Sequence, residues 1–522
     1  MATARGDWAR RVTRPELAVF VSGVASMGLE ILAGRVVAPQ FGNSIYTWGS
    51  IIGVFLAALS LGYHYGGKRA AERANHRRLA RLLLVTAVYV AVLIFAGDLL
   101  LRSTTVFPLP SRFASLPAVI LLFGPPTYLL GFISPYAADL SSTEDVGKAS
   151  GHIYAVGTVG SILGAFGTTY LLIPWLGIDQ IAFVFGVLLV VTAAVVLGRS
   201  PQRRSVFAVA AVGVVLVAAL GSGAVGVSAH GRVVYHTQTP YQELEVADLG
   251  GTRTLYLGGQ RHSAMDKDRP TRHVFEYTRY FHLPYLFAED PGDIDRVLFV
   301  GGGGFTGPRR FAAEYNATID VVEIDPEVIR VAKEYFHLEE SPNLTVYNAG
   351  GRQFLRETNR SYDLIVLDAY KKDKVPFQLT TVEFMRLADR RLTDDGMLYA
   401  NIISAPSGPA GQFYRAEHRT METVFPRVYT FPTHDGSVVQ NIEVIATKSA
   451  ARVTQSTLRE RNRQRDVGID LGDEIRDYSI DDPPEDVPLL RDDRAPVDSL
   501  LEPMVGQRYV LQETAPQNAS AG

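Results

Sequence analysis

The chain has 522 residues, enough for two or three domains, and its formal net charge of −3 at pH 7 argues against a nucleic-acid partner. It contains no cysteine, which excludes disulfides, thiolate metal sites and cysteine nucleophiles. Its composition is uneven, because residues 17–228 consist mainly of apolar runs, whereas residues 231–522 have the mixed composition of a soluble domain with a polar tail.

The first part of the chain contains apolar stretches that are each long enough to cross a bilayer. Soluble domains do not carry so many apolar runs of this length. The seven stretches lie near residues 17–38, 46–66, 82–101, 116–138, 151–173, 178–197 and 205–228. The sequence therefore predicts an all-α, multi-pass domain over residues 1–229, integral to the plasma (cell) membrane, with the lipid bilayer as its partner.

Basic residues are concentrated in three of the segments that flank these stretches, at residues 5–14, 68–81 and 199–204. The positive-inside rule places these segments in the cytoplasm. Seven spans then place the soluble half on the outer side of the membrane.

Residues 230–292 form the next predicted unit. Residues 231–262 alternate between apolar and polar side chains, and Gly250-Gly251 is a hairpin signal, so a small antiparallel β-domain is expected. Residues 271–288 predict a helix whose aromatic side chains face the core.

A strand, a glycine loop, a helix, a second strand and an acidic residue then follow in order. The strands are predicted at residues 297–300 and 319–324. This layout is typical of a nucleotide-binding unit, because glycines allow a close backbone approach, a helix N-terminus presents N–H groups, and an acid accepts ribose hydroxyls. A tight structural turn is the alternative interpretation. The candidate residues are Gly301, Gly302, Gly303, Glu323 and Asp325.

The remaining strands alternate with helices, so residues 293–447 are predicted to form one doubly wound, Rossmann-like α/β domain. Asp368 follows the strand at 362–367, and ligands bind outside the carboxyl ends of such strands, so Asp368 points to the site. A helix cap is the alternative role for this residue. Residues 448–522 are acidic and contain prolines, and they are predicted to form a solvated C-terminal tail. In the alternative interpretation, Leu489-Leu490 and Ala495-Pro496-Val497 tie part of this segment back onto the domain.

Several segments of the soluble half together match the pattern of a known family. They are Tyr241-Gln242, Gln260 after a Leu-Gly-Gly turn, the glycine loop at 301–304, VEIDPEVI at 322–329, Gly350-Gly351-Arg352, and YDLIVLDAY at 362–370. Residues 235–447 resemble the spermidine synthases, or polyamine aminopropyltransferases, which have the class I methyltransferase-like fold. The whole chain resembles the membrane-fused version of that family.

The resemblance implies specific roles. Gln242 would contact the nucleoside, Glu323 would bind ribose hydroxyls, and Asp368 would accept or orient the proton of the attacking amine. The donor would be decarboxylated S-adenosylmethionine or S-adenosylmethionine, the acceptor a small-molecule amine or polyamine, and the assembly a homodimer, with no metal. The expected site comprises catalytic Asp368, the donor-binding residues Gln242, Gly301, Gly302, Gly303, Glu323, Asp325, Gly350 and Gly351, and the substrate-binding residues Gln260 and Asp373.

Three features depart from the family pattern. Gly304 and Gly350 stand where family members have Asp, and Lys371 and Lys372 follow Asp368 where a second acid is usual. Two alternative functions therefore remain open. One is an S-adenosylmethionine-dependent methyltransferase, and the other is a membrane transport or sensing protein whose spermidine synthase-like domain has lost catalysis. The side of the membrane is also open, because donors of this type are cytosolic and the charge rule places the soluble half outside.

Overall fold

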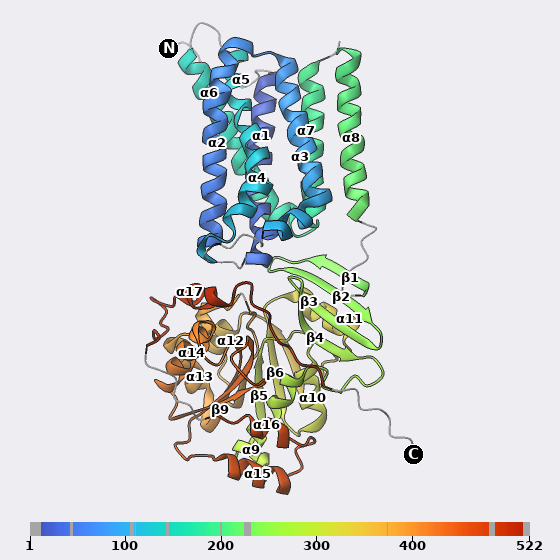
Figure 1. Cartoon of the computed structure of the whole chain (residues 1–522). Helices are drawn as coiled ribbons and strands as arrows, with labels where there is room; N and C mark the ends of the chain where they lie inside the picture. The colour runs from blue at the N-terminus through green and yellow to red at the C-terminus, as the bar shows by residue number, and fades with distance from the viewer. Residues whose placement is uncertain are drawn as a thin grey trace, which may run out of the picture. The chain divides into compact units, whose positions relative to one another are not determined.

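The computed structural model describes residues 12–41, 45–104, 109, 111–141, 146–198, 201–223, 231–372, 374–479 and 486–514. It consists of two compact units, Met1–Val227 and Ser228–Gly522 (Figure 1), which are treated separately below. The division lies close to the boundary expected at residue 229.

The first unit is a bundle of helices. Its helices are α1 (Arg14–Phe41), α2 (Ile45–Arg73), α3 (His76–Ser103), α4 (Leu116–Gly131), α5 (Ile133–Ser141), α6 (Val146–Phe166), α7 (Ile178–Leu197) and α8 (Arg203–Gly223). Within the described residues, seven helical segments are long and apolar enough to cross a membrane, with α4 and α5 together forming one of them. Large apolar side chains such as Phe95, Trp175 and Phe207 are exposed on this unit, which suits a lipid environment.

The second unit begins with a four-stranded antiparallel sheet, as predicted. Its strands are β1 (Arg232–Gln238), β2 (Glu243–Leu249), β3 (Thr252–Leu257) and β4 (Gln260–Asp266), in that order across the sheet. The single helix expected at 271–288 is instead a 3-10 helix, η4 (Glu276–His282), followed by the short α9 (Pro284–Phe287). Pro284 lacks an N–H and therefore begins a new turn rather than continuing the first.

A seven-stranded sheet forms the centre of this unit. Its strands are β5 (Arg296–Val300), β6 (Thr318–Glu323), β7 (Leu344–Asn348), β8 (Tyr362–Leu367), β9 (Leu392–Ser404), β10 (Arg427–Pro432) and β11 (Gln440–Thr447). The order is β10-β11-β9-β8-β5-β6-β7. The five strands from β9 to β7 are parallel, and β11 pairs antiparallel with both β9 and β10. This is the mainly parallel, Rossmann-like arrangement that the sequence predicts.

Helices cover both faces of the central sheet. They are α10 (Thr306–Glu314), α11 (Pro326–Tyr335), α12 (Gly351–Glu357), α13 (Val382–Arg391) and α14 (Gln412–Glu422). Neighbouring residues of β5 enter different cores, since Phe299 packs with Phe281 and Phe311, whereas Leu298 shares the other core with Leu355. Strands that are buried on both faces read as continuous apolar runs, which explains the sequence of β5.

The C-terminal segment corrects one expectation. The predicted solvated tail at 448–522 instead forms α15 (Gln455–Gln464), α16 (Gly472–Arg476) and α17 (Val497–Leu501) in its described part. Its apolar side chains Leu458, Leu471, Ile475, Leu490, Leu500 and Met504 are buried in the two cores.

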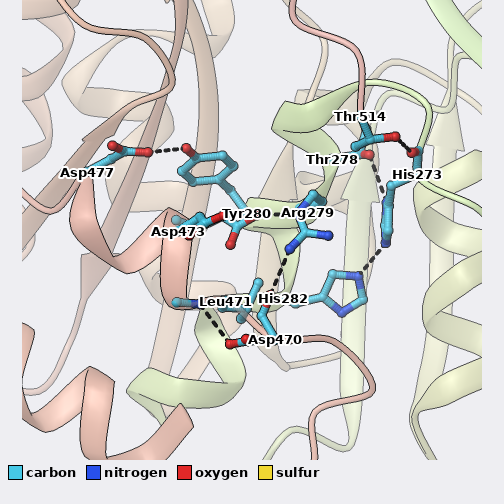
Figure 2. Close-up of polar contacts among 12 residues, drawn as sticks. His273, Thr278, Arg279, Tyr280, His282, Asp470, Leu471, Asp473, Asp477 and Thr514 are labelled. Atoms are coloured by element: carbon cyan, nitrogen blue, oxygen red, sulfur yellow. Dashed lines mark hydrogen bonds and ion pairs between the residues drawn. The ribbon is translucent and has the colours of Figure 1, made fainter. Parts of the chain in front are cut away.

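Two carboxylates and one backbone carbonyl of this segment bond to η4. Figure 2 shows Asp477 accepting a hydrogen bond from Tyr280, and Arg279 reaching the carbonyl of Asp470 at 2.7 Å. Arg279 also pairs with the buried Glu474. The acidic composition therefore did not predict a solvated segment correctly, because these carboxylates have specific partners within the second unit.

Candidate active site

The glycine loop after β5 lies against the backbone at the end of β8. Gly301 has a φ of +100°, and a Cβ at this position would lie 2.2 Å from the carbonyl oxygen of Asp368. The Asp368 N–H in turn donates to the Val300 carbonyl at 3.0 Å. Only glycine fits this conformation and this contact, so Gly301 brings the loop and Asp368 together.

Glu323, at the end of β6, holds the same loop from its other side. Its Oε2 accepts the Gly302 N–H at 2.9 Å, and its Oε1 accepts the Asp325 N–H at 2.9 Å. Burial raises the pKa of Glu323, although these backbone donors oppose that effect. Each carboxylate oxygen has a second lone pair, so Glu323 can still accept ribose hydroxyls.

Both carboxylate oxygens of Asp325 make structural hydrogen bonds. Its Oδ1 accepts the Glu327 N–H at 3.0 Å and so caps α11, while its Oδ2 accepts the Thr239 hydroxyl at 2.6 Å. The side chain is 1% exposed. Because Thr239 Oγ1 also accepts the Gln242 N–H at 3.1 Å, Asp325 fixes the loop that carries Gln242. These contacts give Asp325 a structural role at the edge of the site.

Gln242 lies beside the segment that follows β8. The Lys371 ammonium donates to its Oε1 and lies 3.5 Å from the Leu257 carbonyl oxygen. His262 is near the same ammonium, and desolvation together with this charge lowers the pKa of His262 to about 3. Gln242 and Lys371 are therefore brought together, and His262 is neutral at physiological pH.

The two glycines before α12 have different surroundings. A Cβ on Gly351 would lie 2.3 Å from Val300 Cγ1, so this residue permits close helix–strand packing. A Cβ on Gly350 would meet only Ile324 Cδ1, at 4.0 Å. There is therefore room for a side chain at Gly350, at the carboxyl end of β7, whereas there is no room for one at Gly351.

The rest of the glycine loop contacts β4. The Gly304 N–H donates to Ser263 Oγ at 2.9 Å, and a Cβ on Gly304 would lie 2.8 Å from the Ser263 Cβ. Ser263 thus occupies the space that a side chain at position 304 would need. Gln260 begins β4 opposite Leu257 and is half-buried. Asp373 lies outside the described residues.

Asp368 is half-buried at the carboxyl end of β8, and one of its oxygens is tied to a neighbouring strand. Asn401 Nδ2 donates to Asp368 Oδ1 at 2.9 Å. Burial raises the pKa of Asp368 to about 6, and the Asn401 hydrogen bond opposes the shift. The carboxylate is therefore mostly ionised at pH 7 and has a pKa suited to accepting a proton.

Further polar side chains share the Asp368 face of the sheet. Glu443 of β11 is directly opposite Asn401 of β9, and its Oε2 accepts the Tyr399 hydroxyl at 2.6 Å. Glu443 is fully buried, and burial raises its pKa well above the usual range. Sequence reasoning missed Asn401, Glu443 and Ser263. The signal in the strands was polar residues at every second position within apolar runs, at 399 and 401 and at 441 and 443.

No group of three or more His, Cys, Asp or Glu that could hold a metal ion occurs among the residues that the structure describes.

Part of the second unit is similar to known proteins. Residues 275–434 match the Spermine/spermidine synthase domain. A polyamine aminopropyltransferase of Vibrio vulnificus is 29% identical over 218 residues, which cover 40% of this chain and 70% of the relative. Polyamine aminopropyltransferase 1 of Streptomyces coelicolor is 26% identical over 439 residues and covers 78% of each chain, so the match extends into the helical unit.

Among solved structures, a probable spermidine synthase of Corynebacterium glutamicum is similar, with 23% identity, a TM-score of 0.39, and coverage of 43% of this chain and 85% of the other. The second unit thus contains a match to the Spermine/spermidine synthase domain, and the chain is similar in sequence to polyamine aminopropyltransferases.

Proposed function

We propose that the second unit transfers an aminopropyl group from decarboxylated S-adenosylmethionine to a small amine or polyamine. The observation that carries this proposal is Asp368, whose backbone lies against the glycine loop and whose carboxylate has a pKa raised to about 6. The similarity to polyamine aminopropyltransferases supports the same reaction.

The reaction needs little from the protein beyond positioning and one proton acceptor. The lone pair of the amine attacks the propyl carbon next to the sulfonium, the carbon–sulfur bond breaks, and methylthioadenosine leaves as a neutral thioether. The nitrogen that has formed the new bond gives a proton to Asp368. Since the sulfonium is already a good leaving group, orientation and removal of the proton are the main contributions of the site.

The donor-binding residues in this proposal lie at the ends of β5 and β6 and in the loop between β1 and β2. Glu323 accepts the ribose hydroxyls, Gly301, Gly302 and Gly303 allow the nucleoside to approach the backbone, and Gln242 contacts the nucleoside. Asp325 acts one step away, because it anchors the Gln242 loop through Thr239. The open space at Gly350 leaves this edge of the site without the side chain that family members have there.

The direct test is binding and turnover by the full chain, purified in detergent. We expect methylthioadenosine to bind in calorimetry, and putrescine to be converted to spermidine when decarboxylated S-adenosylmethionine is supplied. The Asp368→Asn variant should bind methylthioadenosine and lack turnover. Folded protein that binds no methylthioadenosine would contradict the proposal.

Methyl transfer from S-adenosylmethionine is a second candidate, and Lys371 favours it. The Lys371 ammonium lies at the Gln242 amide, on the donor side, where it could attract the carboxylate that S-adenosylmethionine keeps and its decarboxylated form lacks. Calorimetry with both donors separates the two candidates. Tighter binding of S-adenosylmethionine, lost in Lys371→Ala, would support methyl transfer.

We propose that the first unit is an integral membrane domain that spans the bilayer seven times, as its apolar helices suggest. The aminopropyltransferase proposal requires the second unit to face the cytosol, where the donor is made, whereas the distribution of basic residues predicts the outer side. A topology reporter fused after residue 230 decides between them. A cytoplasmic signal is expected, and an extracytoplasmic signal would favour the transport or sensing alternative.

A further inference from the structure

A chain of three hydrogen bonds links Asp368 to the C-terminal segment. The Tyr509 hydroxyl donates to Asn441 Oδ1 at 2.6 Å, Asn441 Nδ2 donates to Asn401 Oδ1 at 2.7 Å, and Asn401 Nδ2 donates to Asp368 Oδ1 at 2.9 Å. These four residues come from positions far apart in the sequence. This series of hydrogen bonds runs from the C-terminal segment through β11 and β9 and ends at Asp368, the proposed proton acceptor, which follows β8.

The direction of donation is the same at every link. Each asparagine accepts with its carbonyl oxygen and donates with its amide. The Asp368 carboxylate can only accept, so it sets the sense of both amides, and the Tyr509 hydroxyl holds Asn441 in place by donating to its Oδ1. If an amide turned over, the Asn401 carbonyl would face the Asp368 carboxylate, and two acceptors would oppose each other. The arrangement thus binds Oδ1 of Asp368 and leaves Oδ2 for the amine.

Tyr509 belongs to a segment that is itself fixed at several points. We name residues 504–514 the C-terminal strap. Within it, the Val510 N–H donates to the Val439 carbonyl at 2.8 Å, next to Asn441, and the Lys372 ammonium donates to the Gln507 carbonyl. The strap therefore joins the edge of β11 to the segment that follows Asp368.

The far end of the strap is anchored on the segment before η4. The Thr514 N–H donates to the Val274 carbonyl at 2.9 Å, and the Glu276 N–H donates to the Gln512 carbonyl at 3.0 Å. Figure 2 shows the Thr514 hydroxyl donating to the carbonyl of His273. Contacts on both sides of Tyr509 thus fix the position of its hydroxyl.

We propose that Tyr509 is a positioning residue for the transfer reaction, which fixes the orientation of the Asp368 carboxylate through Asn441 and Asn401. This inference rests on the proposed function, because it assigns Asp368 the role of proton acceptor. The C-terminal strap is then part of the active site, although its residues do not touch the reacting atoms.

The test is the substitution Tyr509→Phe, which removes only the hydroxyl oxygen of the side chain. Tyr509→Phe in the full chain should lower kcat with decarboxylated S-adenosylmethionine and putrescine by about tenfold. It should also move the acidic limb of the pH–rate profile to higher pH, because the Asn401 bond that holds the pKa of Asp368 down is weakened. Methylthioadenosine affinity should stay within about twofold of the unmodified protein, since the nucleoside residues are untouched.

Tyr478→Phe is the matched control. Tyr478 is another half-buried tyrosine of the C-terminal segment, and its hydroxyl donates to the Val453 carbonyl at 3.0 Å, outside the chain of hydrogen bonds. It should leave the pH–rate profile unchanged. A Tyr509→Phe variant that loses activity with an unshifted profile would show a merely structural role and overturn the proposal.

A second readout does not depend on turnover. Because Asp368 has a raised pKa, its contribution to stability is present at low pH and is lost as pH rises through about 6. The difference in melting temperature between the unmodified protein and Asp368→Asn should therefore decrease as the pH rises to about 6 and stay constant above it. When both proteins also carry Tyr509→Phe, the decrease should continue to a higher pH. An unchanged end point would overturn the inference, while absent turnover in the unmodified protein would overturn the proposed function alone.

Discussion

The two sides of the candidate site are built in different ways. On the nucleoside side, Gly301–Gly303 and Glu323 lie within one short stretch of sequence, at the ends of two neighbouring parallel strands. On the amine side, Asp368, Asn401, Asn441 and Tyr509 come from four separate segments. Local geometry creates the first side, and only the completed sheet with the C-terminal strap creates the second.

This difference separates two kinds of experiment. In our proposal the groups of the nucleoside side contact the part of the donor that does not react, so this side should determine donor affinity. The groups of the amine side hold the proposed proton acceptor, so this side should determine the rate. A variant of one side that mainly changed the property assigned to the other would break the distinction.

The largest effect is expected from Asp368→Asn. The substitution keeps the shape of the side chain and removes the proton acceptor, so kcat should fall by about a hundredfold to ten-thousandfold. Calorimetry should show methylthioadenosine affinity close to that of the unmodified protein. Unchanged turnover would remove the role assigned to Asp368, and a lost affinity would place it on the nucleoside side instead.

Glu323→Gln should act on affinity. The substitution removes a negative charge that accepts two backbone N–H groups and, in our proposal, the ribose hydroxyls. Methylthioadenosine affinity should fall about tenfold to a hundredfold, as expected for hydrogen bonds to a charged group. Glu327→Gln is the control, because Glu327 pairs with Arg330 in the first turn of α11. Equal losses in both variants would argue against ribose binding by Glu323.

The pH dependence of the rate should report on the amine side. Burial raises the pKa of Asp368 to about 6, and the group must be ionised to accept a proton. The rate should therefore fall about tenfold for each pH unit below this value and level off above it. Stopped assays between pH 5 and 8 measure this acidic limb of the pH–rate profile. If the residual activity of Asp368→Asn showed the same pH dependence, the limb would report the titration of another group.

The nucleoside side was largely predictable because its parts are close together in sequence. The strand, glycine loop, helix and acid of residues 297–325 predicted the order of these elements, and the structure brings Glu323 and the glycine loop together through the Gly302 N–H, a contact that the pattern did not specify. Asp325 shows the limit of such reasoning. The pattern placed it at the end of the second strand, but it did not reveal that one carboxylate oxygen caps α11 and the other accepts from Thr239 in the distant loop between β1 and β2.

The amine side could not be predicted in the same way. Asn401 and Glu443 are opposite each other only because β11 pairs antiparallel with β9, and the sequence does not state that register. Tyr509 lies in a segment whose acidic composition predicted a solvated tail. The solvated tail was wrong, whereas the alternative, in which Leu490 and Val497 hold the segment against the domain, is confirmed, and Leu500 and Met504 are buried in the same core.

The smallest expected effects compare two adjacent glycines on the nucleoside side. Gly351→Ala should lower the free energy of unfolding by about 1–3 kcal/mol, because its Cβ would lie 2.3 Å from Val300 Cγ1 in a packed core. Gly350→Ala should change it by less than about 1 kcal/mol. Its φ of −74° and ψ of 134° suit alanine, and its Cβ has no atom closer than 4.0 Å.

Denaturant unfolding of the full chain in detergent, followed with a probe in the second unit, measures both glycine variants. Similar losses in the two would mean that the space at Gly350 is closed in solution. A neutral Gly350→Ala that also keeps methylthioadenosine affinity would instead show that the missing side chain at position 350 is a gap at the nucleoside edge. The sequence alone could not distinguish Gly350 from Gly351, because the difference depends on the packing of Val300 of β5 against Gly351.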